Sequence, residues 1–448
     1  MRLFDEVTSL GEKILSELRK RGLEGDVYCE YTLSKSAKIQ NNKHAEASQQ
    51  EEAGVGVRVI VDGRMGFYFA TPQMERDPAA IVDKAIKIAK LNSPIKNWVG
   101  LPTSKPRVSA QDVFSPKLLD VSVEDLIRIN DQLLAECRKD PRIFIYYASI
   151  DVSYDIRRIM NTHGVDVQDE STVALAVMDL VASEAEYSTP SVYSADHSRI
   201  DIPDVLRLYE KCREEALTLL KPRKLDTKVR NVVFTHKAFA ELLEYTLGTV
   251  LTARAFALKR SPFIDKVGTQ VFSRNFTLID DPLMPGGYGT SPFDDEAVES
   301  RRLPIIENGV IKNIISNLYW ASIAGLPPTG HGYRAGYRSL PEISYTNTVI
   351  ESGNVKLDEI LNSEEPHLLV DDLQGAHSSN PESGEFSVAA PCAWIVKKGE
   401  KTPVTGVMLS GNIYEALKNI ELTVERFTLP GLLSPYVIFR ETINVISK

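Results

Sequence analysis

The order of its helix-like and strand-like segments limits what this chain can fold into more than any other feature. Apolar residues recur every three or four positions in residues 1–22 and 78–91, which predicts amphipathic helices. Residues 55–69 alternate apolar and polar side chains around a turn at Asp62 and Gly63, which predicts a hairpin. Helices and strands follow one another without a regular β-α-β rhythm. This favours a multi-domain α+β fold, with mixed sheets and flanking helices, over a doubly wound parallel sheet.

The chain of 448 residues is too long for one simple core. Residues 92–110 are rich in Pro, Ser and Gly, and the basic stretch 221–230 separates a helix from a strand-like run, so both are predicted connectors. We expect an α+β unit at 1–100 and a second at 101–225, which together form an N-terminal domain. A C-terminal domain is expected at 226–448.

Charge and hydropathy exclude several classes of protein. The net charge is -9 and the pI about 5.5, which disfavours binding to nucleic acid or to an anionic membrane. No apolar run approaches the ~18 residues that span a bilayer, and acidic residues interrupt the first segment, which is therefore no signal peptide. The four cysteines lie far apart without a C-x-x-C pair, so we expect buried thiols in a cytoplasmic protein.

The segment Phe234 to Thr249 could be either a zinc-site helix or an ordinary amphipathic helix. It follows a strand-like run, has Thr235 as a helix N-cap, and carries one histidine and two glutamates into an apolar-periodic stretch. A zinc-peptidase helix needs two histidines on one face and a glutamate beside them, but the position four after His236 is Ala240. The residues alone favour an ordinary amphipathic helix, with one apolar face made of Phe239, Leu243, Leu247 and Val250 and with Glu241 and Glu244 towards the other side.

Two glycine-containing loops carry further candidates. Residues 325–336 lack the Lys-Ser/Thr of a phosphate-binding loop, but they could shape a groove with His331 and Arg334 as polar contacts. Residues 375–387 place His377 and Asn380 in a polar loop that could face a ligand. Surface loop and turn roles remain the alternatives for both.

Two acidic clusters could in principle hold a hard cation. They are Asp280-Asp281 and Asp294-Asp295-Glu296. Such clusters more often cap helices and close turns. The sequence contains neither the G-x-S-x-G motif of serine hydrolases nor a Walker motif.

Five ordered motifs resemble one family, TldD/PmbA, also called TldD/TldE, and together they extend over nearly the whole chain. The motifs are GVGVRVIVDGRMGFYFAT, FTLIDDPLMPGGYGTSPFDDEAV, GLPPTGHGYRAGYRSLPEISYTNTVIESGN, NPESGEFSVAAPCAWIVKKGEKTPVTGVMLSGN and LPGLLSPYVIF.

The resemblance implies a zinc metallopeptidase built as a heterodimer. In this family the TldD-type subunit carries H-E-x-x-x-H on a helix and a cysteine near the C-terminus, and the TldE/PmbA-type subunit lacks them. The matching positions in this sequence are Glu244, Tyr245 and Thr249, and no cysteine follows Cys392. The resemblance therefore implies a TldE/PmbA-type subunit without metal, with zinc expected in a TldD-type partner, in a complex that degrades or processes unfolded peptides.

Two other functions remain open from the sequence. One is a homodimeric or larger homo-oligomeric scaffold that binds peptides without cleaving them. The other is a self-sufficient hydrolase that uses His236, His331 or His377 with the acidic loops. Candidates for a peptide or partner groove are His331, Arg334, Asn347, His377 and Asn380.

Overall fold

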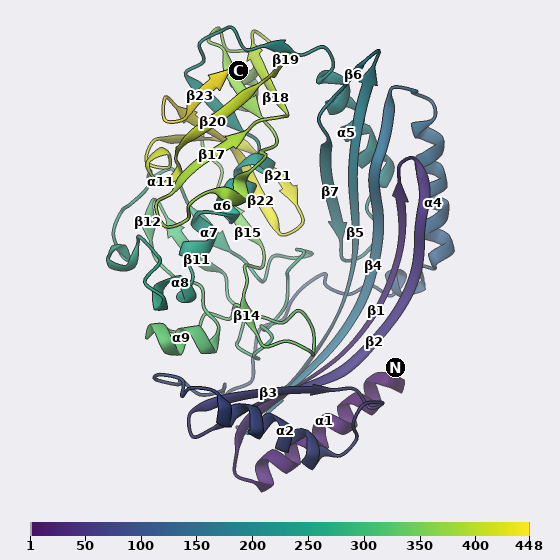
Figure 1. The fold of residues 1–448 in the computed structure, drawn as a ribbon, viewed down its shortest axis with the longest axis vertical. Helices are drawn as coiled ribbons and strands as arrows, with labels where there is room; N and C mark the ends of the chain where they lie inside the picture. The colour runs from purple at the N-terminus through teal and green to yellow at the C-terminus, as the bar shows by residue number, and fades with distance from the viewer. Residues whose placement is uncertain (1, 448) are drawn as a thin grey trace.

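The computed structural model describes residues 2–447, and a long curved sheet dominates its N-terminal half (Figure 1). The seven strands follow the order β3-β2-β1-β4-β5-β6, and β7 also pairs with β5. Four of them have 17 or 19 residues, and the sheet that they form curves along its length (Figure 1). The strands are β1 (Glu24–Gln40), β2 (Lys43–Val61), β3 (Arg64–Ala70), β4 (Ile143–Asn161), β5 (Asp166–Glu184), β6 (Tyr187–Ser188) and β7 (Val192–Ser198).

The pairing of β1 with β4 joins the two predicted N-terminal units in one sheet. β1 is antiparallel to β2 along one edge and to β4 along the other. Residues 1–100 and 101–225 therefore share a sheet although a long connector separates them. Alternation within a strand tells which side chains share a face, but it does not identify the neighbouring strand.

Helices cover one face of this sheet and leave the other face towards the C-terminal half (Figure 1). In the first helix the predicted apolar face is confirmed, because Val7, Leu10, Ile14 and Leu18 are buried and Leu3 is half-buried. The helices are α1 (Arg2–Lys20) and α2 (Pro78–Leu91) at one end, and the short α3 (Pro116–Asp120), α4 (Val123–Cys137) and α5 (Val205–Thr218) towards the other.

The predicted hairpin between β2 and β3 is confirmed. Asp62 and Gly63 both have positive φ, 49° and 72°. Two successive left-handed residues define the type I′ turn, whose twist matches that of the strands it joins.

The C-terminal half contains an eleven-stranded mixed sheet. Its order is β12-β11-β10-β15-β22-β9-β16-β18-β19-β8, with β21 paired to β22. The pairs β15–β22, β9–β16 and β19–β8 are parallel and the rest are antiparallel, so the α+β prediction is confirmed. The strands are β8 (Arg223–Lys224), β9 (Asn231–Phe234), β10 (Leu278–Asp280), β11 (Leu303–Glu307), β12 (Val310–Ile311), β15 (Thr348–Ile350), β16 (His367–Val370), β18 (Ala393–Lys397), β19 (Glu400–Thr405), β21 (Ile420–Leu429) and β22 (Leu432–Arg440).

Smaller elements complete this half. One two-stranded sheet and one three-stranded sheet accompany short helices around the large sheet. They are β13 (Gly332–Tyr333) with β14 (Glu342–Ile343), then β17 (Glu385–Ala389), β20 (Val407–Asn412) and β23 (Asn444–Ser447), and the helices α6 (His236–Glu244), α7 (Leu247–Val250), α8 (Ala253–Ala257), α9 (Leu318–Ala324), α10 (Leu357–Leu361) and α11 (Ile413–Ala416).

Three further observations bear on the sequence predictions. The connector 221–230 is largely exposed, but it also contributes β8, which pairs with β19. The four cysteines are free and buried. Across residues 2–447, no helix has both the length and the apolar character needed to cross a membrane.

Candidate functional site

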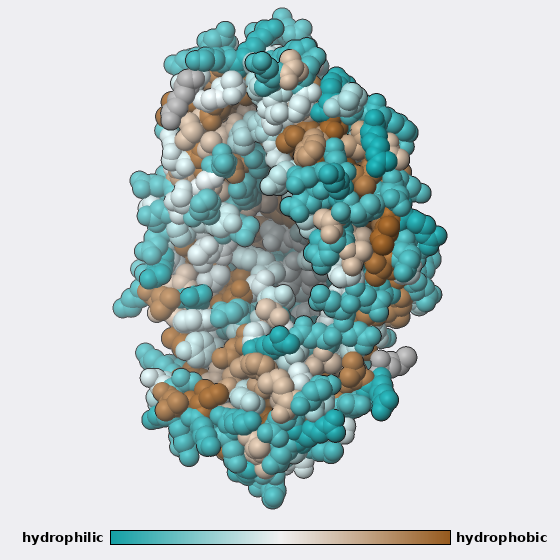
Figure 2. Space-filling model, turned by 45° about the vertical axis from the view of Figure 1, so that its right-hand side comes forward, coloured by the Kyte–Doolittle hydropathy of each residue, from teal (hydrophilic) through white to brown (hydrophobic). Residues whose placement is uncertain are grey.

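A cavity of about 810 Å³ lies between the uncovered face of the N-terminal sheet and the loops of the C-terminal half. Strands β1, β2, β4 and β5 contribute one wall, and residues 282–300 and 330–346 contribute the other. Figure 2 shows the molecular surface hollowed near its middle, with hydrophilic side chains prominent around the hollow. The pairing of the long strands thus places a polar sheet face opposite the loops 282–300 and 330–346, which contain residues that the sequence analysis named as candidates.

Two glycines on β2 let the loop 330–338 lie directly on the sheet. A Cβ atom added at Gly54 would stand 2.2 Å from the ring of Tyr337, and one added at Gly56 would stand 2.5 Å from its carbonyl oxygen. Real side chains do not approach so closely. The backbone N–H of Tyr337 also donates to Glu30 at 2.7 Å. The repeated glycines in AGVGVRV therefore serve a close contact between the two halves of the molecule.

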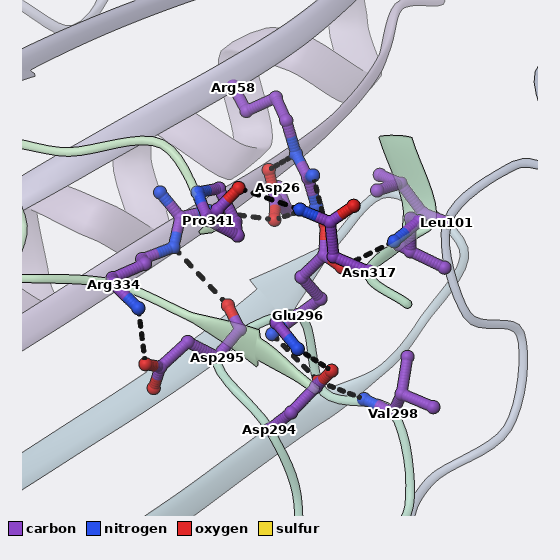
Figure 3. Close-up of polar contacts among 12 residues, drawn as sticks. Asp26, Arg58, Leu101, Asp294, Asp295, Glu296, Val298, Asn317, Arg334 and Pro341 are labelled. Carbon is purple, nitrogen blue, oxygen red and sulfur yellow. Dashed lines mark hydrogen bonds and ion pairs between the residues drawn. The ribbon is translucent and has the colours of Figure 1, made fainter. Parts of the chain in front are cut away.

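A buried ionic cluster lies beside this contact (Figure 3). Arg58 of β2 binds both carboxylate oxygens of Asp26, at 2.9 and 2.8 Å, and its Nη1 donates to Glu296 at 2.5 Å. Nη2 of Arg334 lies 3.4 Å from Asp26. All four side chains are at most 2% exposed. Burial opposes the charge of Arg58, but the two carboxylates outweigh it and raise its pKa above the ordinary value.

The predicted acidic clusters are engaged with protein donors. Asp294 accepts the backbone N–H groups of Glu296, Val298 and Gly332 at 2.8–2.9 Å, and burial raises its pKa to about 8, with Glu296 adding to the shift. Asp295 pairs with Arg157 and accepts the N–H of Arg334 at 2.7 Å. Within residues 2–447, no three His, Cys, Asp or Glu side chains are placed to share a metal ion.

Of the predicted groove residues, two line the cavity, and Asn347 lies buried behind its lining. His331 and Arg334 line it. Nε2 of His331 lies 3.2 Å from Asp280, and its Nδ1 lies 2.9 Å from Oγ1 of Thr329. Asn347 accepts the N–H of Gly289 at 2.9 Å and donates to the carbonyl of Asp281 at 2.8 Å, which fixes the loop in front of it. All three are buried, and these polar contacts shape the wall.

The helix predicted to begin after Thr235 has the expected buried face but is not continuous. Phe239, Leu243, Leu247 and Val250 are buried. The prediction of one helix is wrong, because α6 ends at Glu244 and α7 begins at Leu247. The buried hydroxyl of Thr246 donates to the carbonyl of Leu242 at 2.6 Å, and Thr246 itself has a non-helical backbone, φ −124° and ψ −92°. Thr235 precedes the helix, but its side chain makes no capping hydrogen bond.

The three motif positions lie around this break, and all are exposed. Oγ1 of Thr249 donates to the carbonyl of Glu244 at 3.1 Å. The ring of Tyr245 meets the ring of His377 edge-on, with centroids 6.3 Å apart. They offer a carboxylate, a phenol and a hydroxyl, of which only the carboxylate is a usual zinc ligand.

A second cavity, of about 350 Å³, adjoins Glu244. Leu429, at the end of β21, lines it, as does Cys392. Burial raises the pKa of the Cys392 thiol well above its ordinary value, so the thiol is protonated at neutral pH.

The same cavity borders a buried charge cluster between the two halves of the molecule. Lys237 of α6 pairs with Asp371 and lies 3.4 Å from Glu215 of α5. Burial raises the pKa of Glu215 to about 8, and the neighbouring Asp371 adds to the shift. This cluster ties α6 to the helical layer of the N-terminal half.

The remaining histidine and loop candidates lie apart from the large cavity. His236 is 2% exposed and stacks on Phe427 and Tyr436, with ring centroids 5.4 and 6.0 Å away. Neither of its ring nitrogens has a partner among residues 2–447, and burial lowers its pKa to about 3. His377 is exposed, and Asn380 caps a turn by accepting N–H groups at 2.9 and 3.2 Å. The structure does not join His236, His331 and His377 in one site.

Sequence reasoning missed the polar sheet face that lines the cavity. Its main members are Glu30, Asp155 and Arg157, on strands whose opposite faces are apolar. One signal was present, because YCEYTLSKSAK places Glu30, Thr32, Ser34 and Ser36 at every second position. A uniformly polar alternate face on a long strand predicts exposure, but not which cavity the exposed face lines.

Comparison with known proteins matches three models of one family along the chain. The PmbA/TldA metallopeptidase domain 1 matches residues 25–89, its central domain matches 116–220, and its C-terminal domain matches 227–446. The chain belongs to the TldD/PmbA family. The resemblance carried by the five sequence motifs is thereby confirmed.

Individual members of the family are similar over nearly the whole length. The crystal structure of TldE from Thermococcus kodakarensis superposes with a TM-score of 0.86 at 28% identity, and covers 98% of each chain. An uncharacterized protein of Methanocaldococcus jannaschii is 28% identical over 97% of this chain and 99% of its own. The metalloprotease PmbA of Escherichia coli O157:H7 is 24% identical over 87% of this chain and 86% of its own.

Proposed function

We propose that this chain is the TldE/PmbA-type, non-catalytic subunit of a zinc metallopeptidase complex that processes unfolded peptides. One observation carries the proposal. The sequence resemblance matches the family's metal motif to Glu244, Tyr245 and Thr249, and these three residues lie exposed at the break between α6 and α7. The similarity to the TldE structure supports the same assignment.

The zinc of such a complex would be held by a TldD-type partner. The three motif positions do not fit the ion, because none of them is a histidine, and Leu429, which lines the same cavity as Glu244, offers no thiolate. A catalytic zinc normally takes three protein ligands and leaves one position for water. This chain would instead supply part of the chamber that receives the peptide, through the cavity beside β1 and β4.

Co-expression tests the proposal. A tagged copy of this chain is produced together with a family member that carries H-E-x-x-x-H, and the purified material is measured for stoichiometry, zinc content and cleavage of an unstructured peptide. We expect a mixed complex that binds zinc and cleaves, and a chain that does neither when purified alone. Stoichiometric zinc and cleavage by the isolated chain would support the self-sufficient hydrolase. A homo-oligomer of this chain that does not bind the co-expressed family member would support the homo-oligomeric scaffold.

A further inference from the structure

Two carboxylates on the sheet side of the large cavity lack a cationic partner. They belong to Glu30 on β1 and Asp155 on β4, and both line the cavity. In the strand register Glu30 faces Arg157, and Thr32 faces Asp155. The two carboxylates therefore project from the same face as diagonal neighbours, within reach of one ligand group.

Hydrogen bonds hold these carboxylates without neutralising them. Glu30 accepts the N–H of Tyr337 at 2.7 Å and the hydroxyl of Tyr28 at 3.3 Å. Asp155 accepts the hydroxyls of Thr32 and Ser153, each at 2.7 Å. No Lys, Arg or His of residues 2–447 forms an ion pair with either carboxylate.

The cations nearby have other partners. Arg157 pairs with Asp295 and lies 3.6 Å from Asp169, and Arg338 lies 2.5 Å from Glu52. Burial raises the pKa of Glu30 to about 7, and the charges of Asp295 and Asp155 add to the shift. A bound cation would relieve this unfavourable environment.

The same wall contains a donor that lacks an acceptor. Arg199 is 7% exposed and lines the cavity. Its terminal nitrogens donate to the carbonyls of Tyr288 at 2.7 Å and Thr290 at 3.3 Å, whereas its Nε–H has no partner among residues 2–447. The Nε atom is itself shielded from solvent, so Arg199 supports the wall of the cavity and is not a contact for a ligand inside it.

The surroundings favour an organic cation over a metal ion. Within residues 2–447, no third His, Cys, Asp or Glu side chain is placed to share a metal ion with these two carboxylates. Tyr288 and Tyr333 line the cavity and are 38% and 55% exposed. Their rings can cover the aliphatic stem of a side chain and attract its charged end.

We propose that the cavity binds an extended peptide through a lysine or arginine side chain, whose charged end lies between Glu30 and Asp155. This rests on the proposed function, because it supposes that an unfolded peptide enters the cavity. It goes further in assigning a preference for a basic residue, argued from charge complementarity.

Paired peptides test the preference. Fluorescently labelled, unstructured peptides are made with one central arginine or with citrulline, its neutral isostere, and binding to the full-length chain is measured by anisotropy. We expect the arginine peptide to bind roughly tenfold more tightly, the factor that an ordinary charge-assisted hydrogen bond provides. The double variant Glu30→Gln with Asp155→Asn should bring the arginine peptide down to the affinity of the citrulline peptide.

Two further variants keep the test decisive if the double variant folds poorly. Thr32→Lys retains both carboxylates but places a lysine ammonium group beside them. It should therefore weaken binding of the arginine peptide and leave binding of the citrulline peptide unchanged. Glu170→Gln is the matched control, since Glu170 is exposed on β5 opposite Ile156, on the other face of the sheet, and bonds only Tyr154. It should leave both affinities unchanged.

The outcomes separate this inference from the proposed function. Equal affinity for the two peptides, or an arginine preference that survives both site variants, would overturn the basic-residue site and leave peptide binding intact. If neither peptide binds this chain or its complex with a metal-bearing relative, the proposed function and the inference both fail.

Discussion

The ionic cluster beside the large cavity and the break between α6 and α7 contrast in what their polar residues do. In the cluster, Arg58 and its acidic partners are almost fully buried and satisfy one another across the two halves of the molecule. At the break, Glu244, Tyr245 and Thr249 are exposed, and the fold there depends on the apolar face beneath them. Polar residues are therefore indispensable to the fold in the first region and replaceable in the second. Under the proposed function, this contrast explains how a chain without the metal motif keeps the family fold.

The largest expected effect belongs to the cluster. Arg58→Met removes the only guanidinium that binds both Asp26 and Glu296, and leaves two buried carboxylates poorly compensated. We expect a loss of about 3–5 kcal/mol in the free energy of unfolding, measured by chemical denaturation. Arg2→Met, at a side chain that is 94% exposed, is the control and should have no measurable effect. A loss for Arg58→Met no larger than that of the control would show that the cluster does not hold the two halves together.

The apolar face of the broken helix should give the next largest effect. Leu243→Ala removes a side chain that is buried in the main core of the C-terminal half. Its expected cost is about 2–5 kcal/mol, from lost burial and from the cavity it leaves. Denaturation of this variant measures the structural contribution of α6. A loss below about 1 kcal/mol would mean that the core collapses around the site or that the helix contributes little.

A pH-dependent effect should follow from His236. Burial lowers its folded pKa to about 3, whereas an unfolded histidine takes up a proton below about pH 6.5. The stability that depends on its neutral ring is thus complete above about pH 6.5 and falls as the pH drops towards 3. His236→Phe keeps an aromatic ring between Phe427 and Tyr436 and cannot be protonated. The difference in free energy of unfolding between the variant and the parent should shift by about 2 kcal/mol in favour of the variant when the pH is lowered from 7 to 5.

Denaturation curves at the two pH values measure this gain. Unchanged pH dependence in the His236→Phe variant would show that the His236 ring does not control the loss of stability at low pH.

The smallest effect is expected at the motif position itself. Glu244→Ala alters an exposed side chain outside the apolar face. Its free energy of unfolding should change by no more than about 0.5 kcal/mol. The measurement is made beside Leu243→Ala under identical conditions. Equal losses from these neighbouring residues would show that the buried and exposed faces of α6 are assigned wrongly, and that the polar side chains at the break do contribute to the fold.

Local patterns in the sequence predicted the local structure well. The face of α1, the turn at Asp62 and Gly63 and the buried side of α6 all follow from spacing and side-chain type. The break at Thr246 was not predicted, because a threonine is compatible with an apolar-periodic helix and its bond to the carbonyl of Leu242 depends on local geometry.

The candidate site was harder to predict because it is built from long-range contacts. The loop with His331 and Arg334 does line a cavity, but Glu30 and Asp155 come together only through the pairing of β1 with β4. The carboxylates that bind Arg58 are Asp26 of β1 and Glu296 of a loop far along the chain. The residue pattern within one strand does not indicate which charged side chains from distant parts of the sequence will lie next to it.

Cleavage by the complex of this chain with a metal-bearing relative tests the central claim most directly. In one preparation the motif glutamate of the relative is changed to glutamine, and in another Glu244, Tyr245 and Thr249 of this chain are all changed to alanine. Our account predicts that the first change abolishes cleavage of an unstructured peptide and that the second leaves it essentially intact. Full activity after the first change, together with loss of activity after the second, would contradict the account and place the catalytic chemistry in this chain.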